Sequence, residues 1–470
     1  MKLRFDKSVC EIAAKRITYV VETFRALWGV DEIDQWPEIY YGDITEEARD
    51  DVVISATYVV RSSKVALSPP VWVSSKDNAI LQLLGIEKFP CFHASVEGHD
   101  IDWLGEAFEW LSGADEYAIQ KRDSINRIAY DDSLFSRFNI DPTVPWAGIC
   151  FAALNILIQK TRPLWPDRPV SPFGCNQTVM GASHDVDFIP VSKKDIFKRY
   201  WKNIAIALLA VRDTRLALKI LYHGIPGVGP GLHGCLYNCI AREQALGVTS
   251  SYNIIATKKP HHRDCWYHVD KHVTQEYLNH IIDNNMELGL HGSYTSMQTK
   301  GSLAKEAKLL RSAGYEIIGN RQHWLRFSGS ELYEEVIRAE LSYDSTLGFS
   351  GHIGFRNGAC FPFRPYHFEK ETAYPLLEIP LVMMDVAMEG YGWDAKRLYT
   401  DANKVLEMVR KFSWGGVSIL WHDTVFSGAQ IAMPIAELYW KLVSSSDKWV
   451  SLGEIYKHCA SRYDLPENKK

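Results

Sequence analysis

The sequence lacks the features of a secreted, disulfide-bonded protein. Its 9 cysteines are odd in number and include no CxxC pair, which does not suggest a disulfide framework. Residues 1–12 carry several charged side chains and no apolar signal segment. The longest apolar runs, near 147–158 and 204–211, are too short to span a membrane. We therefore expect a soluble, cytoplasmic protein with reduced thiols.

The sequence also lacks a strong charge of either sign, internal repeats and low-complexity tracts. Its 52 basic and 57 acidic side chains give a formal net charge of −5, without the basic excess that a nucleic-acid partner requires. Apolar residues make up 46% of the chain, which is enough for a large core. The 15 Trp, 23 Tyr and 19 Phe side chains suit sugar rings, although ordinary cores use them equally well.

Residues 1–145 are predicted to form a separate N-terminal accessory domain of α/β type. Residues 17–21 and 52–55 are typical of short strands, and residues 103–112 are typical of an amphipathic helix. The polar stretch that ends at Asp141-Pro142 marks the boundary. This part contains no catalytic constellation, which indicates an accessory role.

Residues 146–470 alternate between predicted strands and helices, a pattern typical of a parallel α/β sheet or barrel. A helical insertion with a Gly- and Pro-rich loop, at about 191–246, interrupts the alternation. In such folds, reactive groups lie at the carboxyl ends of the strands. The predicted strands are 179–183, 248–255, 287–290, 315–319, 376–383 and 416–421.

Four polar clusters follow predicted strands. Two carboxylates one residue apart, as in Asp185 and Asp187, can divide the work of holding a cation and accepting a proton. A histidine that leaves a buried strand into a loop is a reasonable zinc ligand, although a lone histidine is more often structural. The clusters are His184-Asp185-Val186-Asp187, His291, Gly319-Asn320-Arg321-Gln322-His323-Trp324 and Trp421-His422-Asp423.

The order of these clusters resembles that of the polysaccharide deacetylase superfamily, the NodB-homology domain of family-4 carbohydrate esterases. Asp185-Val186-Asp187 matches the first family motif, and Glu287-x-Gly289-x-His291 matches the second. The third motif looks like Arg321-Gln322-His323-Trp324, and the last looks like Leu420-Trp421-His422. The resemblance covers residues 175–430, approximately, and implies a distorted (β/α) barrel of the NodB-homology type.

The sequence departs from the family pattern at two motif positions. Thr295 stands where the family has its second motif histidine, and His323 stands where the family has a proline. His323 could therefore supply the missing imidazole, His184 could do so, or water could complete a site with two protein ligands. The ligand set implied by the resemblance is Asp187, His291 and, as the first choice, His323, around a divalent metal for which zinc is the first expectation.

The resemblance implies a metal-dependent hydrolase that removes an acetyl group from an N- or O-acetylated sugar. The expected partner is an acetylated sugar or an intracellular glycan precursor. Asp185 would act as the general base, and Arg321 would keep that carboxylate ionised. His422 would protonate the leaving amine or alcohol.

Three further residues, Trp324, Arg356 and Asp344, are predicted to bind substrate. Arg356 could bind a carboxylate or phosphate with its guanidinium fork, or could equally hold Asp344 in a structural ion pair. The loop at 261–270 is rich in His and Asp, and we interpret it as contacting substrate or solvent rather than metal.

Two other functions stay open at this point. The first is hydrolysis of a C–N bond in a small non-sugar amide or ureide on the same fold. The second is a non-catalytic carbohydrate-binding or assembly protein that has lost a metal ligand. The sequence does not specify the oligomeric state.

Overall fold

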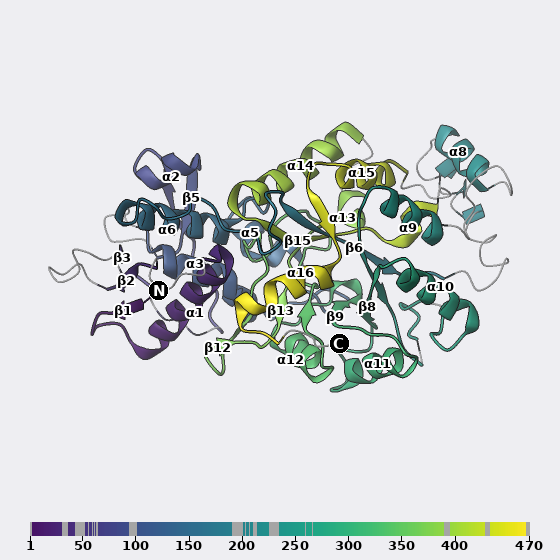
Figure 1. Ribbon diagram of the computed structural model, residues 1–470, viewed down its shortest axis with the longest axis horizontal. Helices are drawn as coiled ribbons and strands as arrows, with labels where there is room; N and C mark the ends of the chain where they lie inside the picture. The colour runs from purple at the N-terminus through teal and green to yellow at the C-terminus, as the bar shows by residue number, and fades with distance from the viewer. Residues whose placement is uncertain are drawn as a thin grey trace.

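The computed structural model places the N-terminal elements beside a curled sheet formed by the rest of the chain (Figure 1). Within the described residues, no helix combines the length and the apolar character that a membrane crossing requires. The structure describes residues 2–466 except 31–35, 43–51, 55, 59, 61, 63, 94–100, 190–200, 203, 206, 210–213, 225–234, 259, 266, 390–394 and 428–432.

The chain begins with a three-stranded parallel sheet of β1 (Lys2–Phe5), β2 (Glu38–Tyr41) and β3 (Val52–Ile54). The strand predicted at 52–55 is therefore confirmed. The strand predicted at 17–21 is wrong, because these residues lie inside α1 (Glu11–Trp28). Ile17, Val20 and Phe24 recur at helical spacing and are buried. The apolar face of an 18-residue helix therefore decides the structure here, rather than the β propensity of five residues.

Helix α3 (Trp103–Ser112) has the predicted bounds, but it has no face exposed to solvent. All of its residues are buried, because α1 and α6 (Trp146–Thr161) pack against it. The other N-terminal elements are β4 (Val71–Ser74), α2 (Ala79–Leu84), β5 (Lys88–Cys91), α4 (Ala114–Ala118) and α5 (Leu134–Arg137).

The predicted boundary after residue 145 falls directly before α6, which contacts elements of both parts. α6 packs against α2 and α3 of the first part and against α14 (Ala395–Phe412) of the second. Two ion pairs with little solvent exposure also join the parts: Arg16–Glu371 and Arg356–Glu116, each at 2.8 Å. The separation of residues 1–145 as an accessory domain therefore stays a prediction.

The second part is built on a nine-stranded sheet, counted over the described residues, in which every pairing is parallel. Its strand order is β13-β10-β9-β8-β7-β6-β15-β14, and β16 pairs with β6 beside this path. The strands are β6 (Val179–Val186), β7 (Ser251–Ile254), β8 (Glu287–Gly292), β9 (Gly319–Gln322), β10 (Tyr343–Asp344), β13 (Leu377–Glu378), β14 (Leu381–Met384), β15 (Gly415–Leu420) and β16 (Lys448–Val450).

The two ends of this sheet are joined by one short stretch of chain. β13 pairs with β10, and after residues 379–380 the chain continues as β14 and pairs with β15. The Ile379 N–H donates to the Asp344 carbonyl (2.9 Å), and the Ser418 N–H donates to the Pro380 carbonyl (2.8 Å). Hydrogen bonding therefore continues across the change of partner, and the sheet curls as a distorted barrel does.

Helices cover the outside of the curled sheet, as expected for parallel strands joined by crossover connections. α10 and α11 contact β8, α12 contacts β10, α14 contacts β15 and α16 contacts β6. The covering helices are α9 (Cys235–Ala245), α10 (His272–Asp283), α11 (Ser302–Ser312), α12 (Ser330–Arg338) and α15 (Met433–Val443), together with α14. α16 (Leu452–Cys459) instead packs against Gly181, on the face of β6 that also carries Ser183 and Asp185.

Two predicted strands differ from the observed ones in ways that matter for the site. β6 runs on to Val186, so Asp185 lies inside the strand rather than after it. β9 begins at Gly319 instead of Tyr315, so Arg321 lies within the strand and is buried. The predicted insertion contains α8 (Thr214–Gly224) and all of α9, while its Gly- and Pro-rich loop at 225–234 lies outside the described residues.

Candidate metal centre

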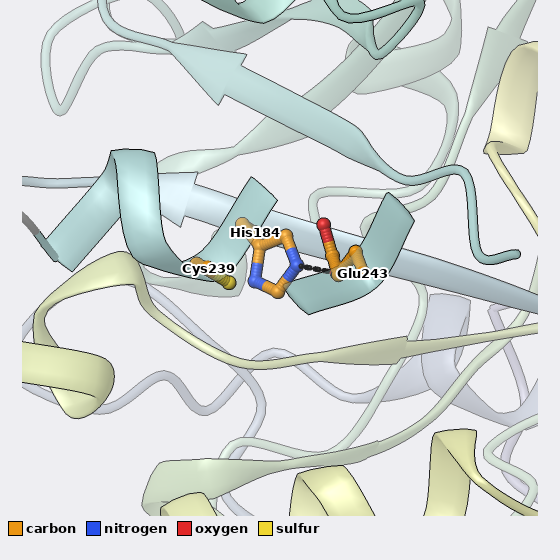
Figure 2. A group of neighbouring side chains, drawn as sticks. All are labelled: His184, Cys239 and Glu243. Atoms are coloured by element: carbon orange, nitrogen blue, oxygen red, sulfur yellow. Dashed lines mark hydrogen bonds and ion pairs between the residues drawn. The ribbon is translucent and has the colours of Figure 1, made fainter. Parts of the chain in front are cut away.

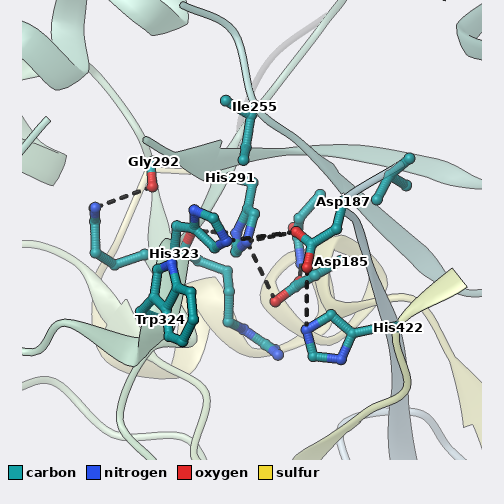
Figure 3. A network of polar contacts seen from close by, with 12 residues as sticks. Asp185, Asp187, Ile255, His291, Gly292, His323, Trp324 and His422 are labelled. Carbon is teal, nitrogen blue, oxygen red and sulfur yellow. Dashed lines mark hydrogen bonds and ion pairs between the residues drawn. The ribbon is translucent and has the colours of Figure 1, made fainter. Parts of the chain in front are cut away.

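The carboxyl ends of four strands of the sheet bring polar side chains together at one mouth of the curled sheet (Figure 3). β6 provides Asp185 and, directly after it, Asp187. β8 provides His291, His323 directly follows β9, and His422 lies just beyond β15. These strands are neighbours in the sheet or separated by one strand, and this explains why residues distant in sequence converge.

Asp187, His291 and His323 form a group whose ligand atoms all lie within 4.8 Å of one another. Asp187 Oδ1 lies 3.8 Å from His291 Nε2 and 3.6 Å from His323 Nε2. Asp187 Oδ1 and His291 Nε2 are buried atoms that have no hydrogen-bond partner among the described residues. Such atoms carry a desolvation cost that a bound cation would offset.

A second layer of contacts turns both imidazoles so that Nε2 faces this group. His291 Nδ1 donates to the Arg321 carbonyl oxygen (2.8 Å). His323 Nδ1 lies 3.2 Å from the Asp264 carboxylate, which also accepts the Tyr294 N–H (2.7 Å). Each contact assigns the proton to Nδ1 and leaves the Nε2 lone pair toward Asp187, as in metal-binding histidines.

The donor set of one carboxylate and two neutral imidazoles fits a zinc-like divalent cation. With metal–ligand bonds of about 2.1 Å, tetrahedral ligands lie about 3.4 Å apart. The observed separations of 3.6 and 3.8 Å are slightly wider, so a small inward movement of the side chains would complete the set. Burial lowers the pKa of His291, which also favours the neutral form that binds metal.

Asp185 lies beside the three-residue group but makes different contacts. Its Oδ2 is 3.6 Å from His291 Nε2, and its Oδ1 accepts a hydrogen bond from Asn253 Nδ2 (2.8 Å). Burial by itself raises the pKa of Asp185. The charges of His291, Arg321 and His422 and the Asn253 hydrogen bond outweigh burial and lower that pKa below its usual value.

Arg321 extends into the interior of the curled sheet rather than forming a direct ion pair with Asp185. Its guanidinium donates to the hydroxyls of Ser345 (3.0 Å) and Ser183 (3.1 Å), and its Nη1 has no hydrogen-bond partner among the described residues. Its positive charge nevertheless contributes to the lowered pKa of Asp185. Arg321 therefore acts on Asp185 through the field of a buried charge.

His422 faces the group from the opposite side. Its Nε2 lies 3.7 Å from Asp187 Oδ2, and its Nδ1 lies 2.8 Å from Asp385 Oδ1. Asp385 also accepts the backbone N–H of His422 (2.9 Å). Burial lowers the pKa of His422, but the negative charges of Asp385, Asp187 and Asp185 outweigh burial and raise it well above its usual value. Asp385 therefore holds His422 in one orientation and favours its protonated form.

His184, one of the alternative ligands, belongs to a separate buried cluster with Glu243 and Cys239 (Figure 2). His184 Nδ1 donates to the Trp421 carbonyl (2.7 Å), and Nε2 contacts Glu243 (2.9 Å). Although burial lowers the pKa of His184, the negative charge of Glu243 raises it overall. The Glu243 carboxylate also accepts hydrogen bonds from the hydroxyls of Ser250, Tyr252 and Tyr439. These contacts use the carboxylate oxygens that a second metal would need.

The predicted substrate-binding residues lie in different places. Trp324 is next to His323 and is 42% exposed, with a left-handed backbone (φ 63°). Arg356 forms a two-point ion pair with Glu116 away from the group. Asp344 is fully buried, and burial raises its pKa while it accepts a hydrogen bond from Asn320 (2.6 Å). Of these three residues, the structure brings only Trp324 to the mouth.

Three residues with evident roles around the site were not singled out for those roles by sequence. Asn253 is a polar residue inside the predicted apolar strand 248–255, and such a residue indicates a buried polar contact. Asp385 directly follows β14, so the rule that placed the other clusters at strand ends would have found it. Asp264 belongs to the polar loop at 261–270, and only the folded chain shows that it contacts His323. Thr295 instead contacts Ser293, with the two hydroxyl oxygens 3.4 Å apart.

No family model and no curated protein matches this sequence. Among solved structures, the chain is similar to a protein from Mycobacterium smegmatis described as a polysaccharide deacetylase. That match has a TM-score of 0.39 and 15% identity, and it covers 65% of this chain and 97% of the other.

Two further similar structures are of the CE4 family. A pseudoenzyme from Bacillus anthracis matches with a TM-score of 0.30 and 12% identity, over 60% of this chain and 66% of its own. A mutant of that pseudoenzyme with restored enzymatic activity matches with a TM-score of 0.30 and 11% identity, over 60% and 69%. These proteins bear the names of the family that the sequence motifs resemble. With TM-scores below 0.5, the site assignment rests on the geometry of this chain alone.

Proposed function

We propose that this protein is a metal-dependent hydrolase that deacetylates an N- or O-acetylated sugar or glycan precursor. One observation carries the proposal: Asp187 Oδ1 and His291 Nε2 are buried without hydrogen-bond partners among the described residues, and His323 completes their group. Asp187, His291 and His323 would hold the cation. When bound, a divalent cation supplies a Lewis acid that lowers the pKa of water and polarises an acyl carbonyl.

The protein's own residues divide the proton transfers between the two sides of this group. Asp185, kept ionised by its neighbours, accepts the proton of the attacking water. His422 donates a proton from Nε2 to the leaving amine or alcohol, because Asp385 holds its Nδ1. Arg321 contributes a buried positive charge that keeps Asp185 in its basic form.

The Asp185→Asn variant tests this assignment. Asparagine can still accept the hydrogen bond from Asn253 but cannot take a proton, so acetate release from an N-acetylated chitooligosaccharide should fall by about 100- to 10,000-fold. Zinc content, measured by elemental analysis, should stay at the wild-type ratio because Asp185 is not in the proposed ligand group.

Asp270→Asn provides the matched control, since Asp270 is an exposed aspartate in a neighbouring loop. Its acetate release should equal that of the wild type. Retained turnover in Asp185→Asn would overturn the role of the base. A wild-type protein that binds no divalent metal, is indifferent to EDTA and still binds glycan would overturn the hydrolase proposal in favour of a binding protein.

A further inference from the structure

An aromatic side chain at the mouth of the site is held with part of its surface open to solvent. The Trp324 ring centroid lies 5.7 Å from that of His323, and the side chain is 42% exposed (Figure 3). The indole Nε1 donates to the Arg263 carbonyl (3.3 Å), and the Trp324 carbonyl accepts from Arg127 (3.1 Å). These contacts hold in place an aromatic surface of the kind on which sugar rings pack.

The guanidinium of Arg263 lies over the faces of Trp324 and Tyr294. The Arg263 Cζ atom is 5.9 Å from the centroid of Trp324 and 5.4 Å from that of Tyr294. Among the described residues, no carboxylate oxygen lies within ion-pair distance of Arg263. Its sequence neighbour Asp264 is turned inward and accepts from the backbone of His261 (2.8 Å) and Tyr294 (2.7 Å).

Two further basic side chains contact the Tyr294 ring. Arg326 is buried, lies 4.4 Å from the Tyr294 centroid and donates to the carbonyls of Ile125 and Tyr294. Among the described residues, no carboxylate oxygen lies within ion-pair distance of its guanidinium. His261 stacks on Tyr294 at 4.5 Å. Partial burial and the positive charges of its neighbours, including Arg263 and Arg326, lower the pKa of His261. This side of the mouth is therefore electropositive.

We propose that the substrate carries an anionic group, a phosphate or a carboxylate, which Arg263 binds while the sugar ring packs on Trp324. This inference rests on the proposed deacetylase function and names the substrate class of the same site. The acetyl group would then lie at the Asp187–His291–His323 group, the ring at Trp324 and the anion at Arg263, in the order in which these side chains neighbour one another. A guanidinium fork recognises both kinds of anion with two parallel hydrogen bonds.

The experiment compares wild type and Arg263→Gln on three acetylated substrates: N-acetylglucosamine 1-phosphate, N-acetylmuramic acid and the neutral N,N′-diacetylchitobiose. The wild type should show a higher kcat/KM on at least one anionic substrate than on the neutral one. Arg263→Gln should lower kcat/KM on that substrate by about 10- to 100-fold, the worth of a charge-assisted hydrogen bond, and leave the neutral substrate unchanged. Whether the phosphate or the carboxylate substrate responds identifies the anion.

Two controls keep the outcomes separate. Arg263→Lys keeps the charge without the fork and should recover part of the loss, whereas Arg397→Gln removes an exposed positive charge on α14 and should change nothing. An equal loss on all three substrates in Arg263→Gln would overturn the inference, because Arg263 would then only support Tyr294 and Trp324.

Calorimetric binding of N-acetylglucosamine 1-phosphate and N-acetylglucosamine distinguishes this failure from failure of the proposed function. If the wild type releases no acetate but Arg263→Gln selectively weakens phosphate-sugar binding, the hydrolase proposal fails and the anion subsite stands. If the two sugars bind the wild type equally, the anion subsite fails whatever the turnover.

Discussion

At the scale of single residues, the direction of each histidine decides its chemistry. His184 is adjacent in sequence to Asp185, yet it points away from the metal group and into the cluster with Glu243. Side chains alternate between the two faces of a strand, so two consecutive residues of β6 cannot serve one site. His323 lies beyond β9, where the chain turns, and this lets its imidazole reach Asp187.

We predict that His323→Ala will weaken Zn²⁺ binding by more than about 100-fold, because loss of a direct ligand should exceed the effect of disturbing a supporting contact. Competition with a chromophoric chelator would measure the affinity. His280→Ala is the matched control, since His280 lies on the covering helix α10 beside Tyr237. If His323→Ala bound zinc with unchanged affinity and stoichiometry, another residue or water would have to be the third ligand.

At the scale of elements, a residue at the end of one strand orients a residue at the end of the neighbouring strand. β14 ends at Met384, and Asp385 at the start of α13 (Asp385–Glu389) contacts both the backbone and the ring of His422. His422 itself lies beyond β15, which pairs with β14. The parallel pairing of two strands thus places a carboxylate behind the His422 imidazole, although the two residues are 37 positions apart in sequence.

The Asp385→Asn variant should lower kcat by about 10- to 100-fold, because His422 keeps its backbone contact but loses the charge that orients its ring. Zinc affinity should be unchanged, since Asp385 contacts none of Asp187, His291 and His323 through a hydrogen bond or ion pair in the described structure. A parallel loss of zinc affinity and kcat would indicate a general disturbance of the mouth and contradict a positioning role. His422→Gln gives the reference for complete loss of the proton donor.

At the scale of the whole molecule, several fully or nearly buried carboxyl groups bind protons more tightly than they would in the unfolded chain. Glu306 on α11 illustrates the effect, because it accepts hydrogen bonds from both the backbone and the hydroxyl of Ser293 in the loop after β8. Burial raises its pKa to about 7. The others with raised pKa values are Asp102, Glu106, Glu287, Asp344 and Glu378.

Glu306→Gln should therefore make the free energy of unfolding less dependent on pH. A raised carboxyl pKa stabilises the fold fully below the ordinary pKa of about 4.5, and this stabilisation is lost as pH rises through about 7. The variant should gain up to about 3 kcal/mol relative to wild type between pH 4.5 and 7.5, in urea titrations at fixed temperature. Parallel stability curves for the two proteins would show that folding leaves the pKa of Glu306 at its ordinary value, and would contradict the prediction.

Much of the barrel part was predictable because its signals are local. Every predicted strand of the sheet except 315–319, of which only Gly319 lies in β9, corresponds to one or two observed strands. The clusters after 179–183, 287–290 and 416–421 meet at one mouth. The N-terminal part was less predictable. The β-branched run at 17–21 is helical because its burial depends on the packing of α1 against α3, which no local pattern contains.

The sequence by itself determined the alternation of strands and helices, the clusters at strand ends and the two aspartates that flank Val186. These follow from apolar periodicity and from the rule that parallel strands end at one edge. Only the tertiary structure shows that His323, and not His184, lies beside Asp187, and that Arg356 pairs with Glu116. It also shows that Asp264, Asp385 and Asn253 support the residues of the site through hydrogen bonds. Those outcomes depend on which face of a strand a side chain occupies and which distant element packs against it, and both are fixed only when the sheet curls.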